Sequence, residues 1–197
     1  MVVIGITGPT GAGKTTALNE LEKLGGAVID CDAVYHEMLE SDITLQDMLV
    51  QAFGDIRNEN HGIDRKKLGA IVFNDPEALE QLNGIVRTAI TRAISELLDG
   101  YRAAGTYRAA AIDGISIFET GLDRLCDTTL AIVAPAEIRI RRIMAREGIS
   151  EEYARARVKA QNPDEFYTSR CAHTLVNDCA DRESFGVRSR ELLERII

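Results

Sequence analysis

Residues 8–15 read Gly-Pro-Thr-Gly-Ala-Gly-Lys-Thr, a complete G-x-x-x-x-G-K-[ST] phosphate-binding loop. The apolar run 2–6 before it predicts a buried strand, and the leucine spacing of 16–24 after it predicts a helix. In this order the glycines let backbone N–H groups point at phosphate oxygens, with the positive end of the helix behind them. The residues predicted to bind nucleotide phosphates are Gly11, Ala12, Gly13, Lys14, Thr15 and Thr16.

Two side chains at the end of this loop carry specific chemistry. Lys14 is predicted to reach the β- and γ-phosphates as a catalytic cation. The hydroxyl of Thr15 is a candidate Mg²⁺ ligand, because Mg²⁺ prefers oxygen ligands and is bound together with substrate phosphates.

Apolar runs alternate with helical stretches along the chain, which is typical of an α/β protein. Further strands are predicted at residues 26–29, 108–112, 128–133 and 174–176. The strands are almost continuously apolar, which indicates a parallel sheet covered by helices on both faces.

The chain of 197 residues is predicted to form one domain with two helical additions. An insertion at about 40–105 has a helix starting near Asp64 and a longer one starting at Asp75-Pro76. Residues 143–161 read as a helical hairpin, interrupted by Gly148 and capped by Ser150, and define a lid at about 143–170. A last helix is expected at about 183–197.

The charge and the apolar runs of the chain limit which kinds of partner are expected. The formal net charge is −8, from 31 acidic and 23 basic residues, so a general nucleic-acid surface is not expected. No apolar run reaches the length of a membrane span, and no signal peptide is recognised at the N-terminus. We therefore expect a cytoplasmic protein with no nucleic-acid or membrane partner.

Carboxylates follow two of the predicted strands. Asp30-Cys31-Asp32 comes directly after the second strand, and Asp113 ends the third. In an open parallel sheet, ligands bind at the carboxyl ends of the strands. One of Asp30 and Asp32 is predicted to hold Mg²⁺ and the other to accept a proton from a substrate hydroxyl; the alternative is that Asp32 only caps a helix at 33–39. Asp113 is predicted to orient the acceptor or the water on Mg²⁺.

Arginines gather near the predicted lid. Arg139, Arg142 and Arg146 share one helix stripe, and Arg157 lies on the next helix. We expect at least one of the last three to contact phosphate, since guanidinium groups pair well with phosphate oxygens. The alternative is a solvated basic face.

Taken together, these elements resemble the dephospho-CoA kinase family, within the group of nucleoside monophosphate kinases. The resemblance rests on the phosphate loop, Asp30-Cys31-Asp32, Leu82-Asn83-Gly84-Ile85-Val86, Asp113 with Phe118-Glu119, and the stretches 142–150 and 157–161. It implies a three-layer P-loop kinase fold with a five-stranded parallel sheet. It also implies transfer of phosphate from ATP, with Mg²⁺, to the 3′-hydroxyl of dephospho-CoA.

The resemblance also implies roles for individual residues. Asp32 matches the family's proposed base, and Arg142 falls among the arginines that contact the nucleotide. The residue pattern itself, rather than the resemblance, groups Arg146 with Arg142 as nucleotide-binding and places Asp113 and Arg157 on the side of the acceptor.

Several positions depart from the family pattern on the acceptor side. Arg87-Thr88 stands where His-Pro is usual, and Tyr167 stands in place of a lysine. Two alternatives are therefore open: a kinase of another small acceptor such as a nucleoside monophosphate, and a nucleotide-binding regulator without transfer activity. A GTPase is disfavoured, because the sequence has neither an [NT]-K-x-D nor a D-x-x-G motif.

Overall fold

The computed structural model describes residues 1–197 and divides them into two compact units. The first unit joins Met1–Ile29 to Gly100–Ile197, and the second is Asp30–Asp99. Each unit is described separately below.

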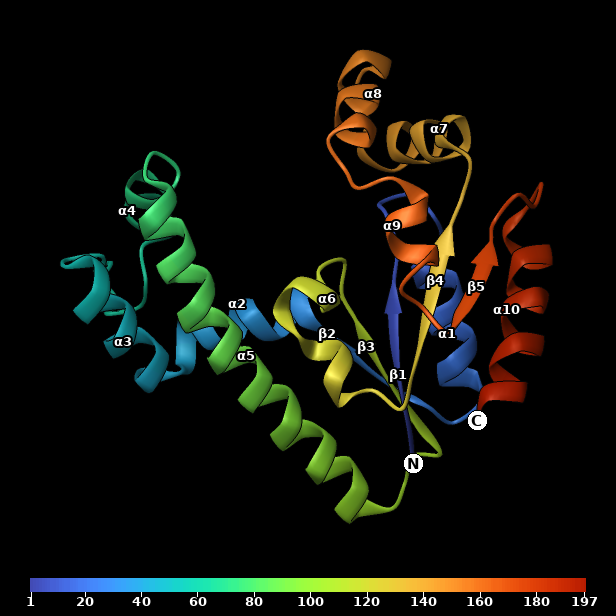
Figure 1. The fold of residues 1–197 in the computed structure, drawn as a ribbon, viewed down its shortest axis with the longest axis horizontal. Helices are drawn as coiled ribbons and strands as arrows, with labels where there is room; N and C mark the ends of the chain where they lie inside the picture. The colour runs from blue at the N-terminus through green and yellow to red at the C-terminus, as the bar shows by residue number, and fades with distance from the viewer. The chain divides into compact units, whose positions relative to one another are not determined.

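A parallel sheet organises the first unit (Figure 1). Its strands are β1 (Val2–Thr7), β2 (Ala27–Asp30), β3 (Ala109–Asp113), β4 (Thr128–Val133) and β5 (His173–Val176), in the order β2-β3-β1-β4-β5. β1 pairs in parallel with β3 and β4, and β4 pairs in parallel with β5. The predicted five-stranded parallel α/β fold is confirmed.

The strands form because their side chains are buried on both faces. Ile4, Ile6, Leu130 and Ile132 are fully buried, and Leu21 of helix α1 (Lys14–Lys23) packs into the same cluster. Helix α10 (Arg182–Ile196) packs beside α1. Since α1 begins where the phosphate loop ends, this packing fixes the direction of the loop.

The remaining helices of the first unit follow β3 and β4. They are α6 (Ile117–Thr120), the 3-10 turn η1 (Leu122–Leu125), α7 (Ala136–Glu147), α8 (Glu151–Lys159) and α9 (Asp164–Thr168). Gly148 ends α7 in a left-handed conformation, and the Ser150 hydroxyl caps α8 by accepting from the Tyr153 N–H, as expected. The strand arrows of β1 and β4 point toward the α7–α8 hairpin (Figure 1).

The second unit is helical. It contains α2 (Cys31–Ser41), α3 (Ile43–Phe53), α4 (Arg65–Val72) and the start of the 29-residue α5 (Pro76–Ala104). The Asp64 carboxylate caps α4, and Asp75 accepts from the N–H groups of Glu77 and Ala78 at the start of α5. These are the two helix starts that the sequence predicts. The domain limits at 40–105 and 143–170 stay predictions.

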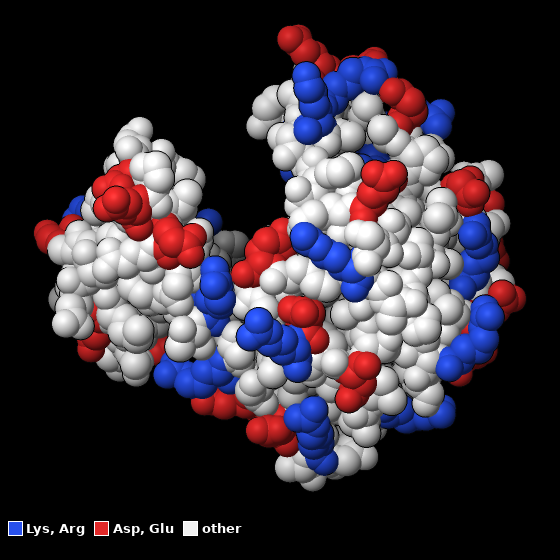
Figure 2. Space-filling view, viewed as in Figure 1, with Lys and Arg blue, Asp and Glu red and all other residues white.

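Acidic and basic side chains are interspersed over both units on the face drawn in Figure 2. None of the helices is long and apolar enough to cross a membrane.

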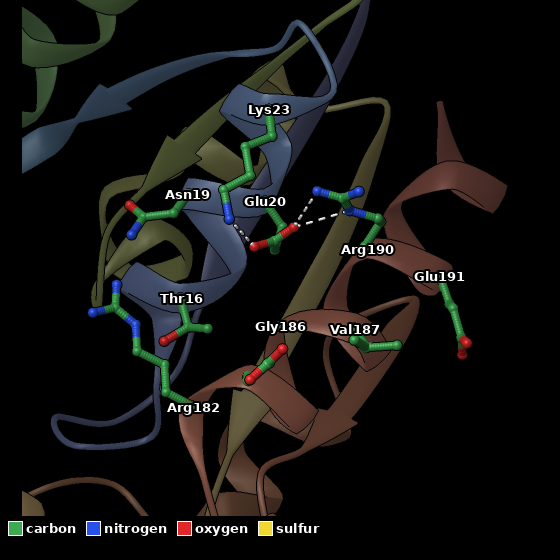
Figure 3. A pocket seen from close by; sticks show the side chains of 10 residues that line it. Thr16, Asn19, Glu20, Lys23, Arg182, Gly186, Val187, Arg190 and Glu191 are labelled. Atoms are coloured by element: carbon green, nitrogen blue, oxygen red, sulfur yellow. Dashed lines mark hydrogen bonds and ion pairs between the residues drawn. The ribbon is translucent and has the colours of Figure 1, made fainter.

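A buried carboxylate joins α1 to α10. Glu20 is 8% exposed, and its Oε1 lies 2.5 Å from Lys23 Nζ. Its Oε2 accepts from Arg190 Nε at 3.0 Å and lies 2.9 Å from Arg190 Nη2. Figure 3 shows Glu20 between these two cations, on the wall of a groove of about 570 Å³ between the helices. The hydrogen bond from Lys23, with help from Arg190, lowers the pKa of Glu20.

This ion pair predicts a pH-dependent stability. Glu20→Gln should lower the free energy of unfolding by about 1 kcal/mol at pH 7, because it removes the charged partner of two half-exposed cations, Lys23 and Arg190. The pKa of Glu20 in the folded protein lies below its ordinary value of 4.5. The stabilisation is therefore present above about pH 4.5 and is lost as the pH falls through the lowered pKa.

Urea denaturation of both proteins between pH 7 and pH 3 checks this. The difference in the free energy of unfolding between wild type and Glu20→Gln should shrink toward zero at the acid end of this range. Glu194→Gln is the control, because Glu194 is an exposed acid on α10, the helix that carries Arg190; it should change stability by less than about 0.5 kcal/mol. A difference that stays constant over the whole pH range contradicts the prediction.

Candidate active site

The phosphate loop connects β1 to α1 at the carboxyl edge of the sheet. Gly8, Gly11 and Gly13 all have positive φ angles, of 143°, 82° and 109°. A Cβ on Gly8 would lie 1.9 Å from the Ile132 carbonyl oxygen, so the loop passes directly against β4. The positive φ angles and the close approach explain why this run needs glycine.

Side chains from outside the loop hold its carbonyl groups. Asn177, which is 3% exposed, donates from Nδ2 to the Ala12 carbonyl oxygen at 2.8 Å. Arg142 Nη1 lies 3.3 Å from the Gly11 oxygen and 3.4 Å from the Ala12 oxygen, and its Nη2 donates to Asn177 Oδ1 at 3.1 Å. Arg142 thus contacts the phosphate loop itself, and its contact with a bound phosphate stays a prediction. Burial lowers the pKa of its guanidinium, which nevertheless stays cationic.

Asn177 is a candidate site residue that the sequence analysis did not name as one. The sequence places it directly after the fifth predicted strand. Its position next to Ala12 depends on the pairing of β5 with β4 and of β4 with β1. The one available signal was a polar side chain at the carboxyl end of a buried strand, where ligands bind in such sheets.

Lys14 and Thr15 are the two loop side chains to which the motif assigns chemistry. Lys14 Nζ donates to the Gly8 carbonyl oxygen at 3.2 Å, which places the ammonium group over the loop. Thr15 is exposed in the first turn of α1. A phosphate in the loop would meet both groups together with the helix N-terminus.

A cavity of about 460 Å³ adjoins the loop. It is lined by Gly13, Thr15, Thr16, Arg142, Arg146, Asn177, Ala180, Asp181, Arg182 and Phe185. Five of the predicted nucleotide-binding residues, Gly13, Thr15, Thr16, Arg142 and Arg146, therefore share a wall with residues of α10 that the sequence did not suggest. Phe185 is 1% exposed and Arg182 lies one residue after the N-cap Asp181. The size and polarity of this cavity suit an adenosine group.

Asp113 lies beside the start of the phosphate loop. It ends β3 opposite Ile6 of β1, and the next N–H, that of Gly114, donates to the Ile6 carbonyl oxygen at 3.3 Å. A carboxylate at this position can face the phosphates or the acceptor.

The two carboxylates after β2 have different positions: Asp30 caps the next helix, and Asp32 lies exposed in its first turn. The helix after β2 begins at Cys31, and its N-cap is Asp30, whose Oδ1 accepts from the Asp32 N–H at 2.9 Å and the Ala33 N–H at 3.1 Å. The alternative in which Asp32 caps a helix at 33–39 is therefore wrong. Since Asp30 supplies the cap, Asp32 stays exposed in the first turn.

The two remaining lid arginines both pair with Glu147 at the end of α7. Arg146 Nη2 lies 2.6 Å from Glu147 Oε1, and Arg157 Nη1 contacts Glu147 Oε2. Hydrogen bonds from Arg146 and then Arg157 lower the pKa of Glu147. Arg146 also lines the cavity, whereas Arg157 is held within the α7–α8 hairpin. Contact of Arg157 with the acceptor stays a prediction.

The close fit at Gly13 makes it a sensitive position. A Cβ there would lie 2.3 Å from Asn177 Nδ2. Gly13→Ala should therefore displace Asn177, which also accepts from Arg142 Nη2, and lower ATP affinity by about tenfold or more, as expected when a charge-assisted hydrogen bond is lost. Equilibrium ATP titration measures this.

Gly25→Ala is the matched control for Gly13→Ala. Gly25 also has a positive φ, of 81°, but a Cβ there meets nothing within 4 Å. The Gly25→Ala variant has the same kind of backbone strain as Gly13→Ala but no clash with a neighbouring side chain. Its ATP affinity should therefore stay within about twofold of wild type. Equal losses in the two variants would attribute the effect to strain alone.

A phosphate loop at the edge of a five-stranded parallel sheet, closed by an arginine-bearing helix and joined to a nucleoside-sized cavity, defines a P-loop kinase. A sequence model of the family "Dephospho-CoA kinase" matches residues 2–183. The chain therefore belongs to the dephospho-CoA kinase family, and it is a kinase.

Individual relatives agree with this assignment. A dephospho-CoA kinase of Dehalococcoides mccartyi is 36% identical over 91% of this chain and 90% of its own length. One from Corynebacterium diphtheriae is 33% identical over 99% of this chain and 97% of its own. The structure of TT1252 from Thermus thermophilus superposes with a TM-score of 0.76 at 30% identity, covering 98% of this chain and 97% of that one.

The structure explains one departure from the family pattern. Tyr167 is 1% exposed and packs with Ala131 and Val133 of β4, so this position contributes to the core. A cation lies nearby instead on Arg170, whose guanidinium stacks 3.8 Å from the centre of the Phe166 ring.

Proposed function

We propose that this protein transfers the terminal phosphoryl group of ATP to the ribose 3′-hydroxyl of dephospho-CoA, giving CoA and ADP. The observation that carries the proposal is the family match over residues 2–183, in a chain whose phosphate loop and adjoining cavity form a donor site.

The contacts of the phosphate loop support a binding site for ATP, the phosphate donor. The adenosine group of ATP would occupy the cavity next to Phe185 and Arg182. The loop N–H groups and Lys14 would hold the phosphates, and Arg142 would stabilise the charge that spreads over the transferred group. Closing the lid would exclude water, so that phosphate passes to the acceptor rather than to solvent.

Asp32 is the residue proposed to act on the phosphate acceptor. Its exposed carboxylate would accept the proton of the acceptor hydroxyl as the oxygen forms its bond to the γ-phosphorus. The bond from that phosphorus to the β-γ bridging oxygen breaks, and the electron pair leaves with ADP. Asp113 and Arg157 are proposed to orient the acceptor.

The residues present fit a magnesium ion held mainly by substrate phosphates. No cluster of three or more His, Cys, Asp or Glu side chains forms a protein metal cage, and Mg²⁺ in kinases is held by few protein oxygens together with phosphates and waters. The exposed Thr15 hydroxyl is the proposed ligand, with Asp30 acting through water. When bound, the ion neutralises charge on the β- and γ-phosphates. A cytoplasmic location stays a prediction.

Product analysis by mass spectrometry tests the proposed acceptor. The purified protein is given Mg-ATP with dephospho-CoA or with a panel of nucleoside monophosphates. We expect CoA and ADP in equal amounts from the first mixture. Transfer to a monophosphate without CoA formation would make it a kinase of another acceptor, and ATP binding without any transfer would identify a regulator.

A further inference from the structure

A buried guanidinium lies between the phosphate loop and the segment that follows α8. Arg139 is 4% exposed, and its Nε donates to the Thr10 carbonyl oxygen at 3.1 Å. Its Nη2 donates to Gln161 Oε1 at 2.5 Å, and its Nη1 lies 3.5 Å from Asp164 Oδ1. Gln161 Nε2 in turn donates to Thr10 Oγ1 at 2.7 Å. Arg139, Gln161 and Thr10 thus form a closed ring of hydrogen bonds.

The Thr10 carbonyl is important because it fixes one peptide plane of the loop. In a trans peptide the C=O and the following N–H point in opposite directions, and this chain has no cis peptide bond. A Thr10 oxygen held on Arg139 therefore turns the Gly11 N–H away from the Arg139 guanidinium. An N–H fixed in this way would meet a phosphate in the loop without rearrangement on binding, which is the requirement for electrostatic preorganisation.

The arrangement depends on the shape of arginine. A guanidinium offers donors in three fixed directions in one plane, and here each direction meets a different partner. A lysine ammonium keeps the charge but cannot reproduce this planar set. The backbone also fits closely, since a Cβ on Gly11 would lie 3.0 Å from the Arg139 carbonyl oxygen.

Arg139 differs from Arg142 in what it connects. Arg142 holds loop carbonyls and also lines the nucleotide cavity. Arg139 instead joins Thr10 to Gln161, which lies between α8 and α9, and to Asp164 at the start of α9. The orientation of the loop is thereby tied to the placement of the lid segment.

We infer that Arg139 is a positioning residue for the phosphate loop: it orients the Gly11 N–H, and Gln161 makes that orientation depend on the segment between α8 and α9. The inference rests on the proposed use of ATP as phosphate donor. Neither residue takes part in bond making; both act through Thr10.

Comparing ATP with adenosine tests this inference. Only ATP has phosphates for the loop, so Arg139→Lys should raise its dissociation constant by about tenfold, as for a lost charge-assisted hydrogen bond, and leave that of adenosine within about twofold. Calorimetric or NMR titration without acceptor measures both. Arg141→Lys is the control, because Arg141 is an exposed arginine on the same helix. Equal weakening of ATP and adenosine, or unchanged ATP binding, would overturn the inference.

A second pair of variants keeps the test valid if Arg139→Lys does not fold. Thr10→Val and Gln161→Leu each remove one end of the hydrogen bond between these side chains. Each should weaken ATP binding by about threefold, and the double variant should be little worse than either single one. Fully additive losses would contradict the inference. Wild-type protein that binds ATP but leaves dephospho-CoA unchanged refutes the proposed acceptor and not this inference.

Discussion

Asp32→Asn should bind ATP with nearly wild-type affinity and turn over about 10²- to 10⁴-fold more slowly, the range for loss of a general base. The change keeps the size of the side chain and removes its negative charge and its ability to accept a proton. The α2 N-cap is unaffected, because the capping hydrogen bonds go to Asp30. Steady-state kinetics with saturating Mg-ATP measures kcat, and a separate titration measures ATP binding.

Glu37→Gln is the matched control for Asp32→Asn. Glu37 is an exposed acid on the same helix, so its replacement removes the same charge from the same element. It should leave kcat within about twofold of wild type. Wild-type turnover in Asp32→Asn would show that proton acceptance lies elsewhere.

Lys14→Met is expected to lower kcat by about 10²- to 10³-fold or more, the range for removing one donor aimed at developing charge. The methionine retains most of the length of the chain but has no cation to place on the transferred phosphoryl group. Since Lys14 Nζ is held over the loop by the Gly8 carbonyl, its charge is already in place before substrate binds. Single-turnover kinetics separates this loss from weaker ATP binding.

Lys159→Met provides the comparison for Lys14→Met. Lys159 is an exposed lysine in the last turn of α8, and its loss should leave kcat within about twofold of wild type. If Lys14→Met retained more than about a tenth of wild-type turnover, the loop would bind phosphate without contributing to its transfer.

Local sequence rules predicted the donor side because its determinants are local. A loop in which Gly11 and Gly13 have positive φ angles, between a strand and a helix, is specified within the first 24 residues of the chain. The bounds of β4, at 128–133, followed in the same way from a continuous apolar run. The helix starts at Asp64 and Asp75 followed from capping chemistry, which acts over three residues.

The supports of the loop could not be predicted, because they come from distant parts of the chain. Arg139 and Gln161 meet Thr10 only after α7 has packed against the loop, and Asn177 meets Ala12 only through the order of the strands. The alternative in which Asp32 caps the helix was wrong for a finer reason. Both are aspartates at the strand end, and a difference of two residues in the helix start decides which one caps.

The packing of α10 on α1 has a consequence for the synthesis of the protein. The phosphate loop emerges from the ribosome early, but Arg182 and Phe185, which form the cavity wall beside it, belong to the last helix. A nascent chain without α10 presents an incomplete nucleotide site with its apolar side open. Since a ligand stabilises just those forms that bind it, we expect nucleotide to stabilise chains with α10 in place more than chains without it.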